Sequence, residues 1–139
     1  MPQTAIFGPV IALVMLTLAV LVYTGYKRFH AGFAGRVKAG DFRYGETANV
    51  PVDVVVTNRN YMNLLEAPVL FYVLCLSLYV TAHVTAVTLS LAWLFVGLRL
   101  AHTAIHLAYN RILYRFGVFA ASNAVLAALW LWFAAALFG

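Results

Sequence analysis

Apolar residues fill three long stretches of the chain, and polar residues gather in the segments between them. Met1 to Tyr26, Ala67 to Leu98 and Phe116 to Gly139 contain no charged side chain. Each stretch exceeds the roughly 18 apolar residues that favour a membrane-spanning helix, because about 20 residues at a rise of 1.5 Å cross about 30 Å of hydrocarbon. The middle stretch is too long for one crossing, so the pattern predicts four spanning helices.

These helices leave little chain for a separate soluble domain. A tight hairpin around Ala82 and His83 joins the second helix to the third, and Pro68 is expected to kink the second. We therefore expect residues 1–139 to form one all-α domain, an integral membrane four-helix bundle. The predicted helices cover residues 6–26, 59–80, 84–109 and 118–138.

Composition and charge agree with a membrane protein. Hydrophobic residues make up 65% of the chain and charged residues 9%, against roughly 45–50% and 25% in soluble domains. The net charge of +5 comes from basic residues that flank the apolar spans. We find no soluble module that recognises nucleic acid, so the expected partners of these residues are anionic lipid headgroups and not nucleic acid.

The connection after the first predicted helix and the connection after the third are both basic. The long first connection carries Arg36, Lys38 and Arg43, and the short last one carries Arg111 and Arg115. Under the positive-inside rule these connections face the cytoplasm, which places both termini on the non-cytoplasmic side.

The second and third helices each carry a polar face inside the apolar pattern. Arg59, Asn63 and Glu66 are spaced i, i+4 and i+7, which brings them to one face of the second helix. The third helix carries a matching set, Arg99, His102, His106 and Tyr109. A straight antiparallel hairpin places at equal depth the pairs Glu66 and Arg99, Asn63 and His102, and Arg59 and His106.

Two interpretations of these polar faces stay open. Ionisable residues inside a membrane are functional candidates by default. Glu66 and Arg99 could instead form a structural ion pair, and Asn63 and His102 could simply join the helices by a hydrogen bond.

The type of ligand follows from the charges. His102 and His106 with Glu66 have spacing that a metal ion could use, but nearby arginines repel cations, so we expect no metal. Arginines favour a small polyanionic ligand held by bidentate carboxylate contacts. The arginines available for this are Arg59, Arg99, Arg111 and Arg115.

These residues resemble those of the MAPEG proteins, the membrane-associated proteins in eicosanoid and glutathione metabolism. The resemblance rests on the run from Arg59 to Pro68 (Arg-Asn-Tyr-Met-Asn-Leu-Leu-Glu-Ala-Pro), on Arg99-Leu-Ala-His102, and on Arg115 thirteen residues later. It extends over nearly the whole chain, and the run in the second helix is most similar to bacterial members, which implies an inner membrane.

The resemblance implies a homotrimer that binds glutathione between neighbouring subunits near the cytoplasmic face. By this likeness Arg115 faces the thiol, Arg28 or Lys27 contributes from the first helix, and the peptide is held by Arg59, Asn63, Glu66 and His102. His106 is added to this set because it follows His102 by one helical turn, where several eukaryotic members carry a tyrosine. Phe116 and Phe119 also stand where hydroxyl side chains occur in some members.

The implied activity is that of a glutathione transferase or peroxidase. A nearby guanidinium favours the thiolate over the thiol, and the thiolate attacks a lipophilic electrophile or a hydroperoxide that arrives from the bilayer. Two other functions remain as alternatives. One is a non-catalytic membrane scaffold of the same fold, and the other is a small multidrug transporter. The transporter is disfavoured because its coupling carboxylate belongs in the first helix, which has no acidic residue.

Overall fold

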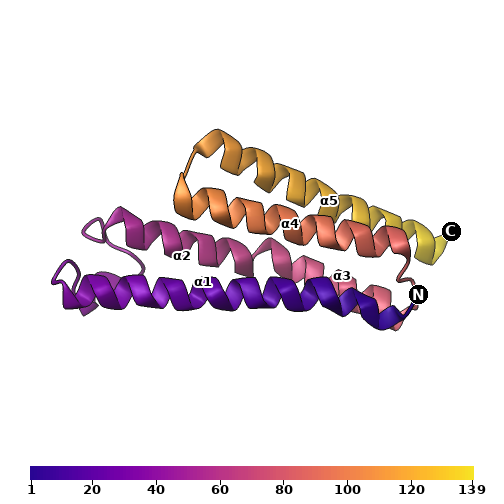
Figure 1. The fold of residues 1–139 in the computed structure, drawn as a ribbon, viewed down its shortest axis with the longest axis horizontal. Coiled ribbons are helices and arrows are strands. Elements are labelled where there is room, and N and C mark those ends of the chain that lie inside the picture. The colour runs from indigo at the N-terminus through magenta and orange to yellow at the C-terminus, as the bar shows by residue number, and fades with distance from the viewer.

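The computed structural model describes all residues, 1–139, as an antiparallel bundle of helices without β-strands (Figure 1). Short 3-10 turns at Gln3–Ile6 (η1) and Ala39–Phe42 (η2) accompany the long helices. The long helices are α1 (Phe7–Phe33), α2 (Val52–Leu65), α3 (Ala67–Val80), α4 (Ala86–Ala108) and α5 (Ile112–Phe138).

Four helical segments are long and apolar enough to cross a membrane, which confirms the predicted number of spans. They cover Gln3–Phe33, Val52–Val80, Ala86–Ala108 and Ile112–Phe138. The predicted bounds of three were too short, because the prediction ended each helix where charged or polar residues begin. Backbone hydrogen bonding continues past that point: α1, with 27 residues, is about 40 Å long and exceeds the hydrocarbon thickness of about 30 Å.

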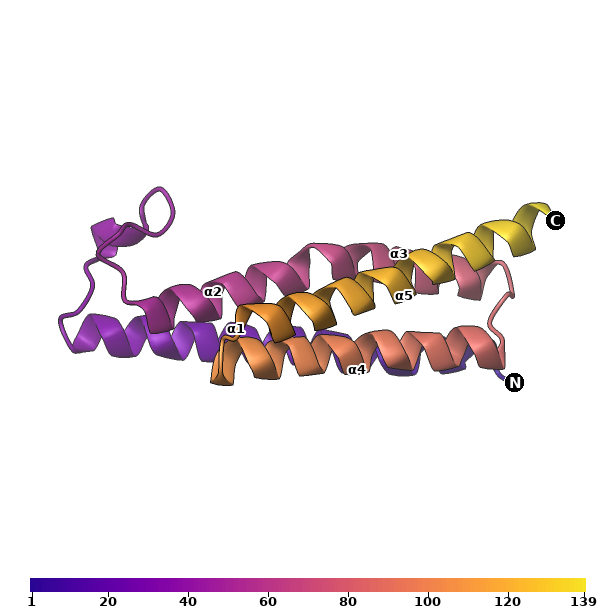
Figure 2. The same cartoon turned by 90° about the horizontal axis from the view of Figure 1, so that it is seen from above.

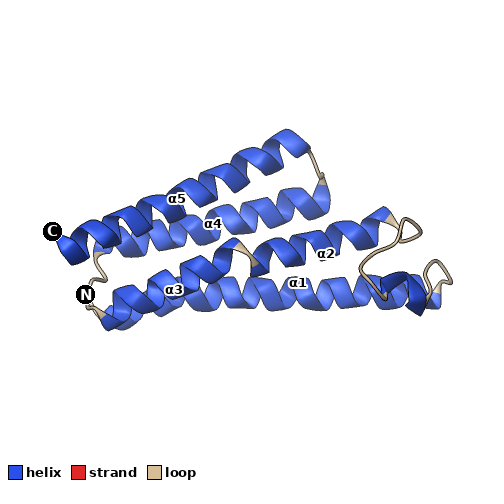
Figure 3. Ribbon diagram, turned by 180° about the vertical axis from the view of Figure 1, so that it is seen from behind, coloured by secondary structure: helices blue, strands red, loops and turns tan.

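The second span is broken at Glu66, between α2 and α3. Glu66 has φ −88° and ψ −95°, and Pro68 occupies the first turn of α3. Proline has no N–H to donate to the preceding turn, and its ring clashes with that turn, so the helix cannot continue straight through this point. Figure 3 shows the break as a short irregular segment in the middle of the second span. The expected kink is therefore present, and it falls on one of the predicted site residues.

The helices pack as two pairs around an apolar core. α1 lies along α2 and α3, and α5 runs antiparallel to α4 and crosses it obliquely (Figure 2). The core is most compact where the rings of Phe71 and Phe95 stack with centroids 4.6 Å apart. Leu13 from α1, Leu74 from α3 and Leu129 from α5 are buried around them.

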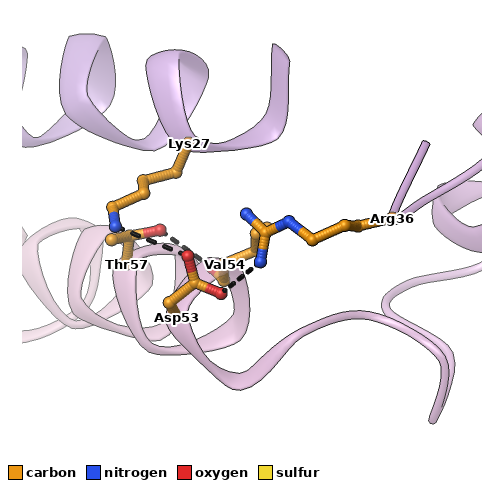
Figure 4. Close-up of polar contacts among 5 residues, drawn as sticks. All are labelled: Lys27, Arg36, Asp53, Val54 and Thr57. Carbon is orange, nitrogen blue, oxygen red and sulfur yellow. Dashed lines mark hydrogen bonds and ion pairs between the residues drawn. The ribbon is translucent and has the colours of Figure 1, made fainter. Parts of the chain in front are cut away.

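The two ends of the bundle differ in character. Both termini lie together at one end, beside the turn between α3 and α4 (Figure 1). The other end carries the α1–α2 connection and the α4–α5 turn, and we call it the polar end. Ion pairs hold the α1–α2 connection there: Lys27 Nζ lies 3.4 Å and Arg36 Nη1 3.3 Å from the carboxylate of Asp53 (Figure 4).

A second acidic residue organises the connection itself. The backbone N–H of Lys38 donates to Asp41 Oδ2 at 2.8 Å, and the Thr47 hydroxyl donates to Asp41 Oδ1 at 3.2 Å. The backbone bond from Lys38 is the main cause that holds the pKa of Asp41 below its ordinary value. Asp41 thus fixes the turn of η2 without entering the interior of the bundle.

Candidate functional site

A cavity of about 370 Å³ opens between α2, α4 and α5, toward the polar end of the bundle. Polar side chains from all three helices meet in it, which is exceptional for an otherwise apolar bundle. These polar side chains are Arg59, Asn63, Glu66, His102, His106 and Arg115.

The wall from the second span confirms the face that the spacing predicts. Arg59, Asn63 and Glu66 all line the cavity. Thr57 and Asn60, on the side of the helix toward the bundle interior, are buried. Glu66 stands at the break between α2 and α3, where its side chain is exposed toward the cavity and is not enclosed among core residues.

The wall from α4 consists of two buried histidines. His102 and His106 are each only 2% exposed, and their ring centroids are 5.7 Å apart. His102 also lies with its ring 5.8 Å from that of Phe119 on α5. Neither ring nitrogen of His106 has a hydrogen-bond partner. Buried polar atoms in folded proteins nearly always have partners, so an unpartnered imidazole at a cavity wall is a candidate for contact with a ligand.

Arg115 enters the cavity from the first turn of α5, and a neighbouring residue orients it. Its Nη1 donates to Asn110 Oδ1 at 2.6 Å. Asn110 forms the turn between α4 and α5 with a φ of 45°, a left-handed conformation that asparagine tolerates better than most residues. The sequence analysis missed Asn110, although an asparagine directly after a helix is a known sign of such a turn.

Four apolar residues complete the cavity: Met62, Ile112, Phe116 and Phe119. Ile112 is 71% exposed and Phe116 is 67% exposed on the outer surface of the bundle. These two side chains therefore present an exposed apolar surface beside the polar residues of the cavity.

The predicted structural ion pair between Glu66 and Arg99 is not formed as a direct contact in this chain, because no charged atoms of the two residues lie within 4.0 Å of each other. Arg99 is fully buried, and its Nη2 donates to Asn123 Oδ1 at 3.2 Å. Its guanidinium carbon lies 5.3 Å from the ring centre of Phe95 and 5.2 Å from that of Phe119. The prediction treated the second and third spans as a straight hairpin. In the structure the break between α2 and α3 directs Glu66 to the cavity, and Arg99 points toward α5.

Two further basic residues lie away from the cavity of this chain. Arg28 faces the α1–α2 connection, where Arg28 Nη2 lies 3.5 Å from Glu46 Oε1 and the guanidinium carbon 4.9 Å from the ring centre of Phe42. Its predicted contact with a ligand stays a prediction that requires a neighbouring subunit. Arg111 is exposed in the α4–α5 turn and does not line the cavity.

The chemistry of the cavity is set by its charges. Arg59 and Arg115 carry two positive charges, Glu66 carries one negative charge, and the two imidazoles are buried. No group of three His, Cys, Asp or Glu side chains is placed to hold one metal ion. Such a set suits a small molecule that carries both anionic groups, such as carboxylates, and a cationic group.

Comparison with known proteins agrees with this description. The model of the MAPEG family matches residues 6–135, which includes every residue that lines the cavity. No curated protein and no solved structure matches the chain.

Proposed function

The chain belongs to the MAPEG family, and from this premise we propose that it is a membrane-bound enzyme that activates the thiol of glutathione. The activated thiol attacks lipophilic electrophiles, as in a transferase, or hydroperoxides, as in a peroxidase. The observation that carries the proposal is the cavity in which Arg59, Glu66 and Arg115 meet beside the exposed apolar side chains of Ile112 and Phe116.

The charged groups of the cavity complement those of glutathione. At neutral pH glutathione has two carboxylates, one ammonium group and a thiol. Arg59 offers a planar pair of donors for a carboxylate, and Glu66 offers an acceptor for the ammonium group. Asn63 lies between them on the same face and supplies both a donor and an acceptor for the peptide groups. Of the charged residues in the cavity, Arg115 then remains to contact the thiol.

The reaction needs a thiolate, and Arg115 favours its formation. A cysteine thiol has an ordinary pKa of about 8.5 and is mostly protonated at neutral pH. A guanidinium beside the sulfur stabilises the negative charge directly, and more strongly where water is excluded. The thiolate then displaces a leaving group from carbon or adds to carbon, which gives a thioether. Attack on a hydroperoxide oxygen gives an alcohol and an oxidised sulfur, which a second glutathione reduces.

The setting of the enzyme is part of the proposal. The polar end faces the cytoplasm of a bacterium, the bundle spans its inner membrane, and both termini lie on the other side. Three copies assemble so that Arg28 of one subunit approaches the cavity of the next. The basic residues of the α1–α2 connection and the α4–α5 turn support this orientation, and the trimer is carried over from the MAPEG family.

The decisive experiment is calorimetry of glutathione binding to the detergent-purified protein, with ultraviolet difference absorbance on the same sample to detect thiolate. We expect saturable binding with a thiolate signal. Binding without thiolate would indicate a protein that holds the ligand without activating it. No binding would overturn the proposal and favour the non-catalytic scaffold.

Glu66→Gln should raise the Kd for glutathione by roughly tenfold, which is about 1.4 kcal/mol, because the variant loses the charge opposite the ammonium group. A charge-assisted hydrogen bond has this magnitude. Calorimetry with the analogue that lacks the amino group is the control, since the variant and the unchanged protein should bind that analogue with similar affinity. An equal Kd for glutathione in both proteins would remove Glu66 from the binding residues.

Asn110→Gly should lower kcat several-fold without lowering the melting temperature. Glycine keeps the left-handed turn but removes the oxygen that orients Arg115. Asn110→Asp retains an acceptor at the same place and is the matched control, with activity closer to that of the unchanged protein. Equal activity in Asn110→Gly would show that Arg115 needs no such support.

A further inference from the structure

A groove of about 700 Å³ lies at the polar end, between the last turns of α1 and the α1–α2 connection. Figure 2 shows this connection beside the end of α1. The groove shares no lining residue with the proposed glutathione site. Its volume falls within the range of sites that hold small molecules, roughly 300–1,000 Å³.

The connection forms a fixed wall of this groove. Val37 is buried in a small apolar cluster that joins the connection to α1 and α2, and Phe42 packs against that cluster. The guanidinium carbon of Arg28 on α1 lies 4.9 Å from the ring centre of Phe42. Arg28 Nη2 also lies 3.5 Å from Glu46 Oε1. These contacts hold the connection against α1 and leave the groove open between them.

Two glycines on α1 form part of the opposite wall. Gly25 and Gly32 are seven residues apart, which places them two turns apart on one face of the helix. A Cβ atom at either position would meet no atom of the chain within 4 Å. Glycine inside a helix costs about 1 kcal/mol relative to alanine, and no close packing within this chain requires it here. The space that these glycines leave is the groove itself.

We propose that this groove binds an anionic phospholipid from the membrane leaflet at the polar end. One acyl chain lies along the glycines and the rings of Phe29 and Phe33, and the phosphate lies beside Lys38. All five residues line the groove. The lipid takes no part in the proposed reaction, so this site stands or falls separately from glutathione binding.

The charges of the groove select an anion. Lys38 and Arg28 line it, and no acidic residue does. The charge of Arg28 is shared with Glu46, whereas Lys38 is exposed and has no carboxylate within 4.0 Å of its ammonium group. A lysine ammonium binds phosphate as a point charge. A second copy of this chain would instead bring the same basic connection, from a protein with a net charge of +5.

The depth of the groove points to a ligand from the membrane. The charge-free part of α1, from Phe7 to Tyr26, has about 20 residues and is about 30 Å long, which matches the hydrocarbon core. The turns that follow, up to Phe33, therefore extend into the headgroup layer. Phe29 and Phe33 are 70% and 90% exposed there. Their rings provide apolar surface for the upper part of an acyl chain.

The test is native mass spectrometry of the detergent-purified full-length protein, titrated with phosphatidylglycerol or with phosphatidylcholine of the same acyl chains. We expect one phosphatidylglycerol per chain, with a Kd about tenfold below that of phosphatidylcholine, since a charge-assisted contact has this magnitude. Gly32→Leu fills the groove and Lys38→Gln removes its free charge, so each should raise the Kd for phosphatidylglycerol about tenfold. The backbone bond from Lys38 to Asp41 is retained in Lys38→Gln.

Arg43→Gln is the matched control. It removes one positive charge from the same connection, but Arg43 does not line the groove, so the Kd should stay unchanged. Glycerol 3-phosphate, which carries the phosphate without acyl chains, should not displace the lipid at equal concentration.

Four results would overturn the proposal. Equal Kd values for the two lipids, or for Lys38→Gln and Arg43→Gln, would reduce binding to general charge attraction. Displacement by glycerol 3-phosphate would assign the groove to a free phosphate ester. The same spectra count chains: if Gly32→Leu changes that count and leaves the Kd for lipid unchanged, the groove is an interface between copies. Should Gly32→Leu not fold, the comparison of Lys38→Gln with Arg43→Gln decides alone.

Discussion

Replacing Arg115 with alanine should lower kcat for glutathione conjugation by about 10²- to 10³-fold, the cost of removing one preorganised group that stabilises developing negative charge. Arg115 reaches the cavity from the first turn of α5 and is oriented by Asn110 at 2.6 Å. In the proposed binding mode Arg59 and Glu66 still hold the carboxylate and ammonium groups, so the Kd for glutathione should rise much less. A loss in kcat that exceeds the loss in affinity identifies an interaction made mainly in the activated state.

Two variants control this experiment. Arg111→Ala removes an arginine of the same turn that does not line the cavity, so it should retain activity. Arg115→Lys keeps a positive charge without the planar fork and should fall between the alanine variant and the unchanged protein. If Arg115→Ala and Arg111→Ala have equal kcat, Arg115 has no part in activating the thiol.

Arg99→Ala should lower the free energy of unfolding by about 2–5 kcal/mol, the range found for removing a large side chain from a packed core. Arg99 is fully buried, and its guanidinium lies between the rings of Phe95 and Phe119. Arg99→Met keeps most of the volume and removes a charge whose Nε and Nη1 have no partner. This variant should lose less than about 1.5 kcal/mol or become more stable.

Thermal unfolding in detergent distinguishes packing from charge as the role of Arg99. If packing dominates, the melting temperature falls for alanine and not for methionine. If the charge is needed, the melting temperature falls in both variants. Glu66→Gln is the matched control: since Glu66 makes no ion pair with Arg99 in this chain, its stability should stay within about 0.5 kcal/mol of the unchanged protein. A large loss of stability in Glu66→Gln would instead indicate that Glu66 and Arg99 form an ion pair.

The fold was largely predictable because a bilayer constrains the sequence of the helices that cross it more tightly than water constrains the sequence of a soluble protein. Long apolar stretches without charge can only be spans, and the turn at Ala82 and His83 follows from their length. The bounds of α1 and α2 were missed for a related reason. Their ends extend beyond the apolar region, where Lys27 and Asp53 pair across the two helices, and hydropathy carries no information about that pairing.

The candidate site was predictable only for residues that lie on the same helix. Helical spacing placed Arg59, Asn63 and Glu66 on one face, and the same rule placed His102 with His106. The partner of Arg99 and the role of Asn110 depend on how α5 returns along α4, which no local pattern encodes.

Both ends of the polypeptide lie at the opposite end of the bundle from the α4–α5 turn (Figure 1), beside which the cavity lies. The molecule can therefore be tethered to a sensor surface through either terminus, with its ligand entrance facing the flowing solution. Fluorescent proteins fused at the two ends would share one compartment, so their brightness or quenching in living cells would report the orientation of the whole molecule.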